Sequence, residues 1–308
     1  MHNSQVFPKA GTRMYEHSFA LRARLVTAIA LLCVTAAACA QNPSATAPQA
    51  ATAAQAQANP AKSENDAMLA RAGNLYYSTT KFGLGGFTCA IHPDWYTLFV
   101  SARKGETVRA DDPRIVLLKT VKMTLHVRMK GGSTLDWQPA PDPNNTLDSD
   151  SVTLLKDMHE ATDQTLQGFL QFWTPFVDGS AVPENSEGLD ITKTGNGYRL
   201  HAVTSDTEVT EEMDNQLTLT RFNVVMKQAT VDFAPTYGPT SQGLLVNGFL
   251  AHILAAREPA EKMQEMHVGV EYKAVEGFQI PSRLNMEVIG SGTFNFNFDD
   301  CTVSRQAN

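Results

Sequence analysis

The sequence predicts a mainly β protein whose strands follow one another as an antiparallel meander, accompanied by two or three helices. Apolar residues alternate with polar ones at strict period two in several segments, most clearly over 121–129, 284–288 and 294–298. Turn signals recur between these segments, and strands do not alternate with helices as they do in parallel α/β folds. The 308 residues, 43% of them apolar, are enough to build such a fold.

The first 40 residues are typical of a secretory signal peptide. Basic residues precede an apolar run over 25–34, and small residues follow it up to Ala40. The run is shorter than the roughly 20 residues that a membrane-spanning helix needs. We therefore expect residues 1–40 to be removed and the protein to be periplasmic or secreted.

Two cleavage sites compete in this segment. Ala38-Cys39-Ala40 suits an ordinary signal peptidase, whereas Ala36 to Cys39 resembles a bacterial lipobox, which would leave Cys39 as a lipidated N-terminus. In that case the protein would be a lipoprotein tethered to the outer membrane. Residues 41–62 are rich in Ala, Gln and Pro and predict a disordered linker, which could serve as a tether or as a spacer.

The charge excludes nucleic acid as a partner. After residue 40 the chain carries 21 basic and 31 acidic residues, and no cluster of Lys or Arg interrupts this excess of acid. Anionic lipid surfaces are disfavoured for the same reason.

The cysteine count predicts one disulfide. Cys33 lies in the apolar part of the signal peptide and Cys39 at the cleavage region, so Cys89 and Cys301 are the pair left in the folded part. In an oxidising compartment such a pair is expected to form a bridge between the first and last strands. Two cysteines without a histidine at ligand spacing make a poor metal site, so none is expected.

The folded part is predicted to run from residue 63 to 304 as one domain. Ser63 and Asp66 suggest a capping box that opens a helix with an apolar face from Met68 to Tyr76. Residues 87–100 predict a strand broken at Pro93, and residues 121–129 a second strand. Residues 130–133 form a turn before a strand that begins at residue 135.

The longest helical pattern follows a polar loop over 139–150. Its start is expected at Ser149 or Ser151 and its end at Pro175. Residues at helical spacing form a stripe along one side of this helix, which is polar in its middle and aromatic near its end. The stripe comprises Val152, Leu155, His159, Thr162, Leu166, Phe169, Leu170 and Trp173.

From residue 188 onward the patterns predict strands. Residues 189–194 and 198–203 flank a Gly-Asn-Gly turn, and residues 208–213 and 216–222 suggest a second hairpin. Further strands are expected over 224–231, 243–255, 267–275, 282–289 and 293–303.

The end of the chain carries a family resemblance. Residues 272–286, YKAVEGFQIPSRLNM, precede two more alternating strands, and the chain begins with a small-residue helix followed by a Gly-Phe-Thr-Cys strand. This order of elements resembles the LolA/LolB-like superfamily over residues 63–304, as a divergent bacterial member. The resemblance implies an unclosed antiparallel β-barrel, or half-barrel, with a concave apolar interior and a helical lid.

The resemblance also implies a role in the cell envelope. Members of the superfamily carry or accept lipid or the acyl chains of lipoproteins, so we expect a hydrophobic ligand under a lid formed by the helix that ends at Trp173. Soft and aromatic side chains suit such a cavity. The expected lining residues are Met123, Met129, Met213, Met226, Met286, Phe294, Phe296, Phe169 and Trp173.

No catalytic signature is present in the sequence. It lacks a G-x-S-x-G elbow, an H-E-x-x-H helix, a P-loop, a G-x-G-x-x-G turn and a C-x-x-C pair, so neither an enzyme nor a cofactor is expected. The alternative to a lipid carrier is a non-catalytic envelope protein of the same fold, with a structural or interaction role and no bound ligand. A large cavity under the long helix would favour the carrier, and a tightly filled sheet face would favour the alternative.

Overall fold

The computed structural model describes residues 60–102, 107–140, 147–204, 206–256 and 258–306. The expected signal peptide, Cys39 and most of the expected linker lie outside these residues. The described part runs from helix α2 to strand β12, and residues 60–62 of the expected linker belong to α2.

Twelve strands form one antiparallel sheet, in the order β3-β2-β1-β12-β11-β10-β9-β8-β7-β6-β5-β4. The strands are β1 (Leu84–Pro93), β2 (Lys122–Arg128), β3 (Gly132–Gln138), β4 (Asp190–Thr194), β5 (Gly197–Val203), β6 (Thr207–Asp214), β7 (Leu219–Met226), β8 (Ala229–Thr240), β9 (Gly243–Ala255), β10 (Gln264–Val275), β11 (Phe278–Val288) and β12 (Gly292–Arg305). Strands β3 and β4 lie at the two ends of this order and do not pair with each other, so the sheet stays open. The predicted antiparallel half-barrel is confirmed.

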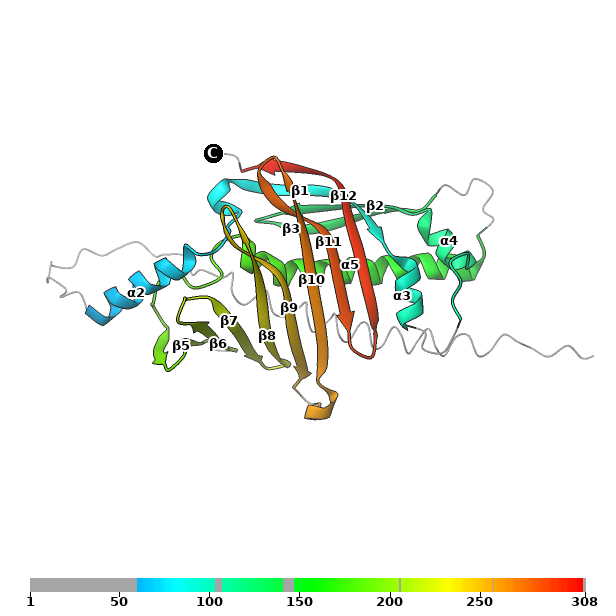
Figure 1. Ribbon diagram of the computed structural model, residues 1–308. Coiled ribbons are helices and arrows are strands. Elements are labelled where there is room, and N and C mark those ends of the chain that lie inside the picture. Colours follow the sequence, from blue (N-terminus) through cyan, green and yellow to red (C-terminus); the bar gives the residue numbers. More distant parts are fainter. Residues whose placement is uncertain (1–59, 103–106, 141–146, 205, 257, 307–308) are drawn as a thin grey trace, which may run out of the picture.

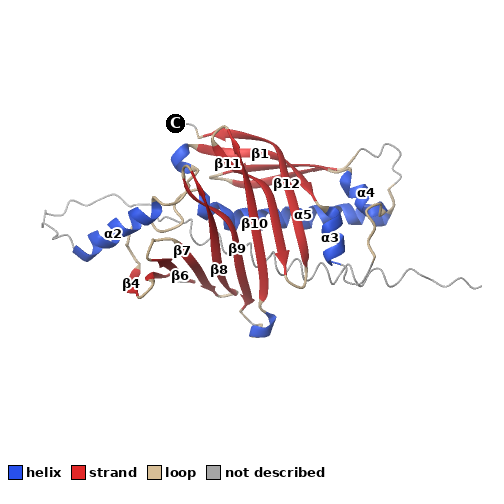
Figure 2. Cartoon of the chain, in the orientation of Figure 1, coloured by secondary structure: helices blue, strands red, loops and turns tan. Residues whose placement is uncertain are grey.

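Four α-helices accompany this sheet in the described residues, whereas the sequence predicts two or three. They are α2 (Pro60–Gly73), α3 (Trp95–Ala102), α4 (Pro113–Lys119) and α5 (Ser149–Val177). The sheet curls around α5, which runs behind the strands in Figure 1. Helix α2 lies near one end of the sheet, and α3 and α4 lie near the other, so the fold has one layer of strands and a second, incomplete layer of helices (Figure 2).

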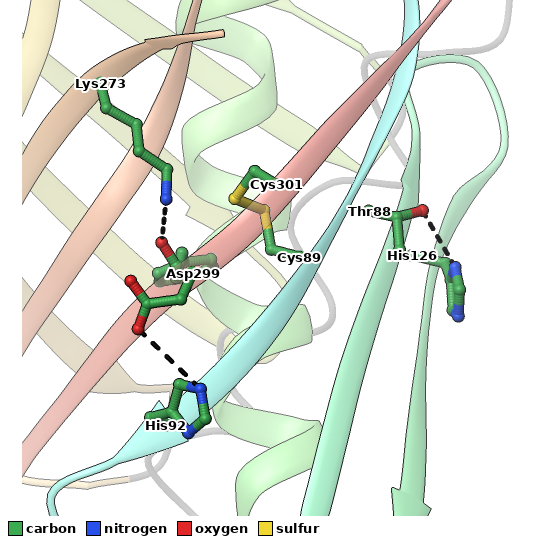
Figure 3. The surroundings of a disulfide bond; sticks show 8 residues. Thr88, Cys89, His92, His126, Lys273, Asp299 and Cys301 are labelled. Carbon is green, nitrogen blue, oxygen red and sulfur yellow. Dashed lines mark hydrogen bonds and ion pairs between the residues drawn. A yellow bond between two sulfur atoms is a disulfide. The ribbon is translucent and has the colours of Figure 1, made fainter.

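The first and last strands, β1 and β12, are neighbours in the interior of the sheet, two strands away from the β3 edge. Strand β1 pairs with β12, with Phe87 opposite Val303 and Ile91 opposite Phe298. This pairing joins β2 and β3, from the N-terminal part, to a meander that otherwise follows chain order from β4 to β12. The disulfide between Cys89 and Cys301 lies on this pair, with Cα atoms 4.1 Å apart and sulfur atoms 2.08 Å apart (Figure 3). The predicted bridge is confirmed.

The prediction of a continued strand after Pro93 is wrong. Residues 95–102 form α3 because Asp94 caps a helix there: its carboxylate accepts hydrogen bonds from the Thr97 amide at 3.0 Å and the Thr97 hydroxyl at 2.6 Å. Trp95 and Phe99 are four residues apart and both are buried, which is helical spacing.

Several boundaries also differ from the expectations; for example, β3 begins at Gly132 instead of residue 135. Helix α2 begins at Pro60, and Asp66 accepts hydrogen bonds from Ser186 instead of closing a capping box with Ser63. Residues 224–231 are not one strand, since β7 ends at Met226 and β8 begins at Ala229. Helix α5 continues two residues beyond Pro175 to Val177.

The G-F-x-I-P segment, residues 277–281, lies mostly within a strand. Glu276 and Gly277 form the turn between β10 and β11, both with positive φ, of 49° and 88°. The residues from Phe278 to Pro281 already belong to β11, where Pro281 lies opposite Tyr272 beside a register shift. The segment therefore begins a strand, and the turn lies before it.

Candidate ligand-binding site

Helix α5 covers the inward face of the sheet. Asp148 caps its first turn, where the side chain accepts a hydrogen bond from the Ser151 amide at 2.7 Å. Its apolar side faces the strands over most of its length, as the sequence predicts, but Val152 at the start of the stripe is 54% exposed. The predicted packing of Phe169 and Trp173 against the sheet is confirmed, because each is only 1% exposed.

The C-terminal half of α5 is held by aromatic contacts. The ring of Phe172 lies 4.6 Å from that of Phe233 on β8 and 6.0 Å from that of Phe249 on β9. Trp173 meets Phe87 on β1 edge to face at 6.1 Å. These contacts join α5 to strands on both sides of the sheet centre, so this half of the helix is firmly packed.

The end of α5 is also fixed by hydrogen bonds to the segment that precedes β1. The Thr79 amide donates to the Val177 carbonyl at 2.6 Å, and the Thr80 amide donates to the Asp178 carbonyl at 3.1 Å. The Thr80 hydroxyl donates to the Asp178 carboxylate at 2.8 Å. This end of the helix is therefore its fixed point.

The N-terminal half of α5 is less deeply packed. Leu155 and Thr162 are buried, but Met158, His159 and Ala161 are only half-buried. The imidazole of His159 stacks on the indole of Trp137 at 5.0 Å. Because this half is less deeply packed than the C-terminal half, the helix can move most easily at its N-terminal end.

A small cavity lies at the seam between this half of α5, α3 and β12. Its volume is about 10 Å³, which is room for about one water molecule. Its lining includes Trp95, Met158, Ala161, Phe294 and Phe296. This seam is therefore filled by side chains in this conformation, and a ligand that entered there would have to displace part of the helix.

The structure brings eight of the nine expected lining residues into one apolar cluster between α5 and the sheet. These are Met123, Met129, Met226, Met286, Phe294, Phe296, Phe169 and Trp173. Met213 is also buried, but it belongs to a second cluster beneath α2, together with Leu69, Ala72 and Leu200. Met213 lies in the second cluster because its strand, β6, is near the β4 edge of the sheet, where α2 covers it.

Glu211, a residue that the sequence analysis did not single out, lies between the two clusters. It is 8% exposed, and it is the sole acid or base among the buried polar residues of the described chain. Its Oε2 atom and the hydroxyl of Tyr237 have no hydrogen-bond partner within that part of the chain. Burial raises the pKa of the Glu211 carboxyl to about 8, so it is largely protonated at neutral pH.

The opposite face of β4 to β7 carries a polar hollow of about 530 Å³. Ion pairs cross it, including Arg199 with Glu212 at 3.0 Å and His201 with Glu208 at 3.1 Å. Its lining is polar throughout: Asp190, Thr192, Arg199, His201, Glu208, Thr210, Glu212, Arg221 and Asn223. Acids and bases are mixed there, so the hollow has no strong field of either sign.

The histidines of the described residues lie apart from one another or beside single carboxylates. His126 contacts Asp136 at 3.2 Å, and Glu265 contacts both His252 and His267. No group of three His, Cys, Asp or Glu side chains in the described ranges is arranged to hold a metal ion. None of the helices described is both long enough and apolar enough to cross a membrane.

Comparisons with protein-family models, with curated proteins and with solved structures find no match for this chain.

Proposed function

We propose that this protein binds a hydrophobic ligand, a lipid or the acyl chain of a lipoprotein, between α5 and the inward face of the sheet. The observation that carries the proposal is the arrangement of α5, which covers a continuous apolar face and is held by hydrogen bonds and aromatic contacts at its C-terminal end. Such a helix can act as a lid, because its less deeply packed N-terminal half can leave the sheet while its aromatic half stays packed.

The energetics are favourable for a chain of moderate length. Burying an acyl chain contributes about 0.8 kcal/mol per methylene, so a twelve-carbon chain would gain roughly 9 kcal/mol. This gain is opposed by the loss of contacts that Leu155 and Met158 make with the rest of the cluster. Methionine and phenylalanine side chains along β2, β11 and β12 can repack around the chain, since methionine adapts to irregular shapes.

Native mass spectrometry of the mature protein, purified without detergent, tests the proposal. We expect a fraction of the protein to carry an additional mass that corresponds to a lipid. We also expect 1-N-phenylnaphthylamine, a fluorescent apolar probe, to bind saturably and to be displaced by long alkyl chains. A protein that carries no lipid and does not bind the probe would contradict the proposal.

One observation favours the alternative of an envelope protein with an interaction role and no lipid. The space under α5 is filled, whereas the hollow on the outer face of β4 to β7 is open to solvent. In that case Arg221→Ala and Asn223→Ala would abolish the capture of an envelope partner without affecting probe binding.

We further propose that the protein is exported. The signal-peptide pattern of residues 13–41 and the disulfide between Cys89 and Cys301 support this proposal, because such bridges persist in oxidising compartments. Mass spectrometry of the mature N-terminus should find Gln41, for a released protein, or acylated Cys39, for a lipoprotein at the outer membrane. A mature chain that retains residues 25–34 would contradict both forms.

A further inference from the structure

The position of Glu211 along β6 places a carboxyl between two apolar environments. Inward-facing side chains on this strand alternate with outward-facing ones. Val209 packs against the cluster under α5, and Met213 belongs to the cluster under α2. Glu211 lies between them, facing inward, so it marks the boundary of the two clusters.

Aromatic contacts connect this boundary to the C-terminal half of α5. The ring of Phe172 on α5 lies 4.6 Å from that of Phe233, which lies 6.2 Å from that of Phe222. Phe222 is directly opposite Glu211 in the pairing of β6 with β7. An apolar chain that follows these rings from under α5 would therefore end at the Glu211 carboxyl.

A second polar group lies at the same boundary. Tyr237 packs against both clusters, and its ring centroid lies 5.2 Å from that of Tyr76. The Tyr76 hydroxyl is engaged, since it accepts a hydrogen bond from the Leu219 amide at 2.6 Å. The Tyr237 hydroxyl lies beside that of Tyr76 but makes no hydrogen bond of normal geometry within the described chain. Burial chiefly raises the pKa of Tyr237, the neighbouring Tyr76 raises it further and the charge of Glu211 adds to this rise, so Glu211 and Tyr237 lie within electrostatic range.

A buried carboxyl and a buried phenol without partners are costly in an apolar interior, unless another molecule supplies the missing hydrogen bonds. We propose that Glu211 and Tyr237 bind the polar end of the ligand, and that this end carries hydrogen-bond donors: an alkyl or acyl chain with an ammonium or hydroxyl head group. This inference rests on the proposed function, because it assigns the head group of the same apolar ligand.

The charges around Glu211 indicate which class of ligand head group, cationic, neutral or anionic, this site would bind. Burial alone shifts the pKa of Glu211, and no cationic side chain contributes to that shift. An ammonium would be neutralised by the ionised Glu211 carboxylate, whose proton leaves to solvent, and a hydroxyl could donate to the carboxyl without any change of charge. A ligand carboxylate could accept hydrogen bonds from the protonated Glu211 and from Tyr237 but would meet no positive charge, so free fatty acids should bind more weakly than amines.

Three probes of equal chain length test the assignment: dodecylamine, dodecanol and dodecanoate, each used to displace 1-N-phenylnaphthylamine from the mature protein. We expect dodecylamine to bind at least about tenfold more tightly than dodecanoate. Glu211→Gln should remove most of this preference while leaving the affinity for dodecanol within about threefold. Tyr237→Phe, which conserves the ring, should weaken both dodecylamine and dodecanol.

Glu212→Gln is the matched control, because Glu212 is the next residue along β6 and lies on the outer face, where it pairs with Arg199. It should leave all three affinities unchanged. Equal affinities for the three probes in wild type, or an unchanged preference in Glu211→Gln, would overturn the head-group assignment and leave the proposed apolar site intact. If wild type binds neither the dye nor any probe, the proposed function fails together with the assignment.

Discussion

The indole Nε1 of Trp173 on α5 donates a hydrogen bond to the hydroxyl of Tyr272 on β10, at 2.8 Å. The same hydroxyl donates to the Val246 carbonyl on β9 at 2.5 Å. One phenol thus links the lid helix to two central strands, inside an otherwise apolar layer. Burial raises the pKa of Tyr272, so the hydroxyl stays protonated and able to donate throughout the physiological range.

Tyr272→Phe should therefore loosen the lid. It leaves the Trp173 indole N–H and the Val246 carbonyl without this partner in a buried place, which costs about 1–3 kcal/mol. Urea unfolding should show that loss, and the association rate of an apolar dye should rise because the C-terminal end, on which the opening of α5 turns, is held less firmly. Tyr96→Phe is the control, since Tyr96 on α3 is 41% exposed and should alter neither quantity. An unchanged stability of Tyr272→Phe would show that this linkage contributes nothing.

Trp173→Ala separates a lid from a purely structural helix. Truncating this buried aromatic should lower the free energy of unfolding by about 3–5 kcal/mol in either case. If α5 is a lid, retention of lipid or dye should fall more than the loss of stability explains. Phe278→Ala provides the comparison, because Phe278 is similarly buried on β11 and stacks beneath Arg305. Equal loss of retention in both variants would argue against a specific role of Trp173.

The strands could be predicted from the sequence because the sheet has one buried and one exposed face. Met123, Leu125 and Val127 are buried while their neighbours on β2 are not, and this difference produces the period of two. Helix α3 was missed because its eight residues are apolar on nearly every position. Only the cap from Asp94 and the spacing of Trp95 and Phe99 distinguish it from a strand.

The candidate site could be predicted only in part. The alternation of apolar and polar residues along a strand predicts which methionine and phenylalanine side chains are buried. It does not predict which helix covers them, because that depends on the order of strands in the sheet, and this order places Met213 under α2. An acid at an inward position of an alternating strand, as Glu211 is between Val209 and Met213, was a usable signal. The absence of a hydrogen-bond partner for Glu211 could not be predicted from the sequence, because it depends on packing between distant elements.

Removing the disulfide should destabilise the protein strongly. The bridge closes a loop of 212 residues, for which the chain-entropy model gives a contribution of about 5 kcal/mol. Cys89→Ser combined with Cys301→Ser should shift the urea midpoint to lower concentration, and wild type in reducing agent should behave in the same way. Because β1 and β12 remain paired by backbone hydrogen bonds, we expect the circular dichroism of the folded variant to be unchanged. A double variant as stable as the oxidised protein would contradict the prediction.

The pH dependence of stability should report Glu211. Its pKa is raised from 4.5 in the unfolded chain to about 8 in the folded protein, so between these values the folded state binds more protons than the unfolded state. The associated stability is fully present below pH 4.5 and is lost progressively as the pH rises to about 8. The loss amounts to a few kcal/mol. Asp214, Tyr76 and Tyr237 are nearby titratable groups, and the two tyrosines have raised pKa values and stay neutral over this range.

Glu211→Gln should abolish this part of the pH dependence, since the amide cannot ionise. Relative to wild type, the variant should gain stability steadily between pH 5 and 8, as measured by urea unfolding at each pH. Glu212→Gln should leave the wild-type slope unchanged, because Glu212 is partly exposed and paired with Arg199 on the outer face. Parallel curves for wild type and Glu211→Gln would mean that the Glu211 carboxyl titrates near its ordinary pKa. Its burial between the two clusters would then have to be relieved by water or by movement of α2.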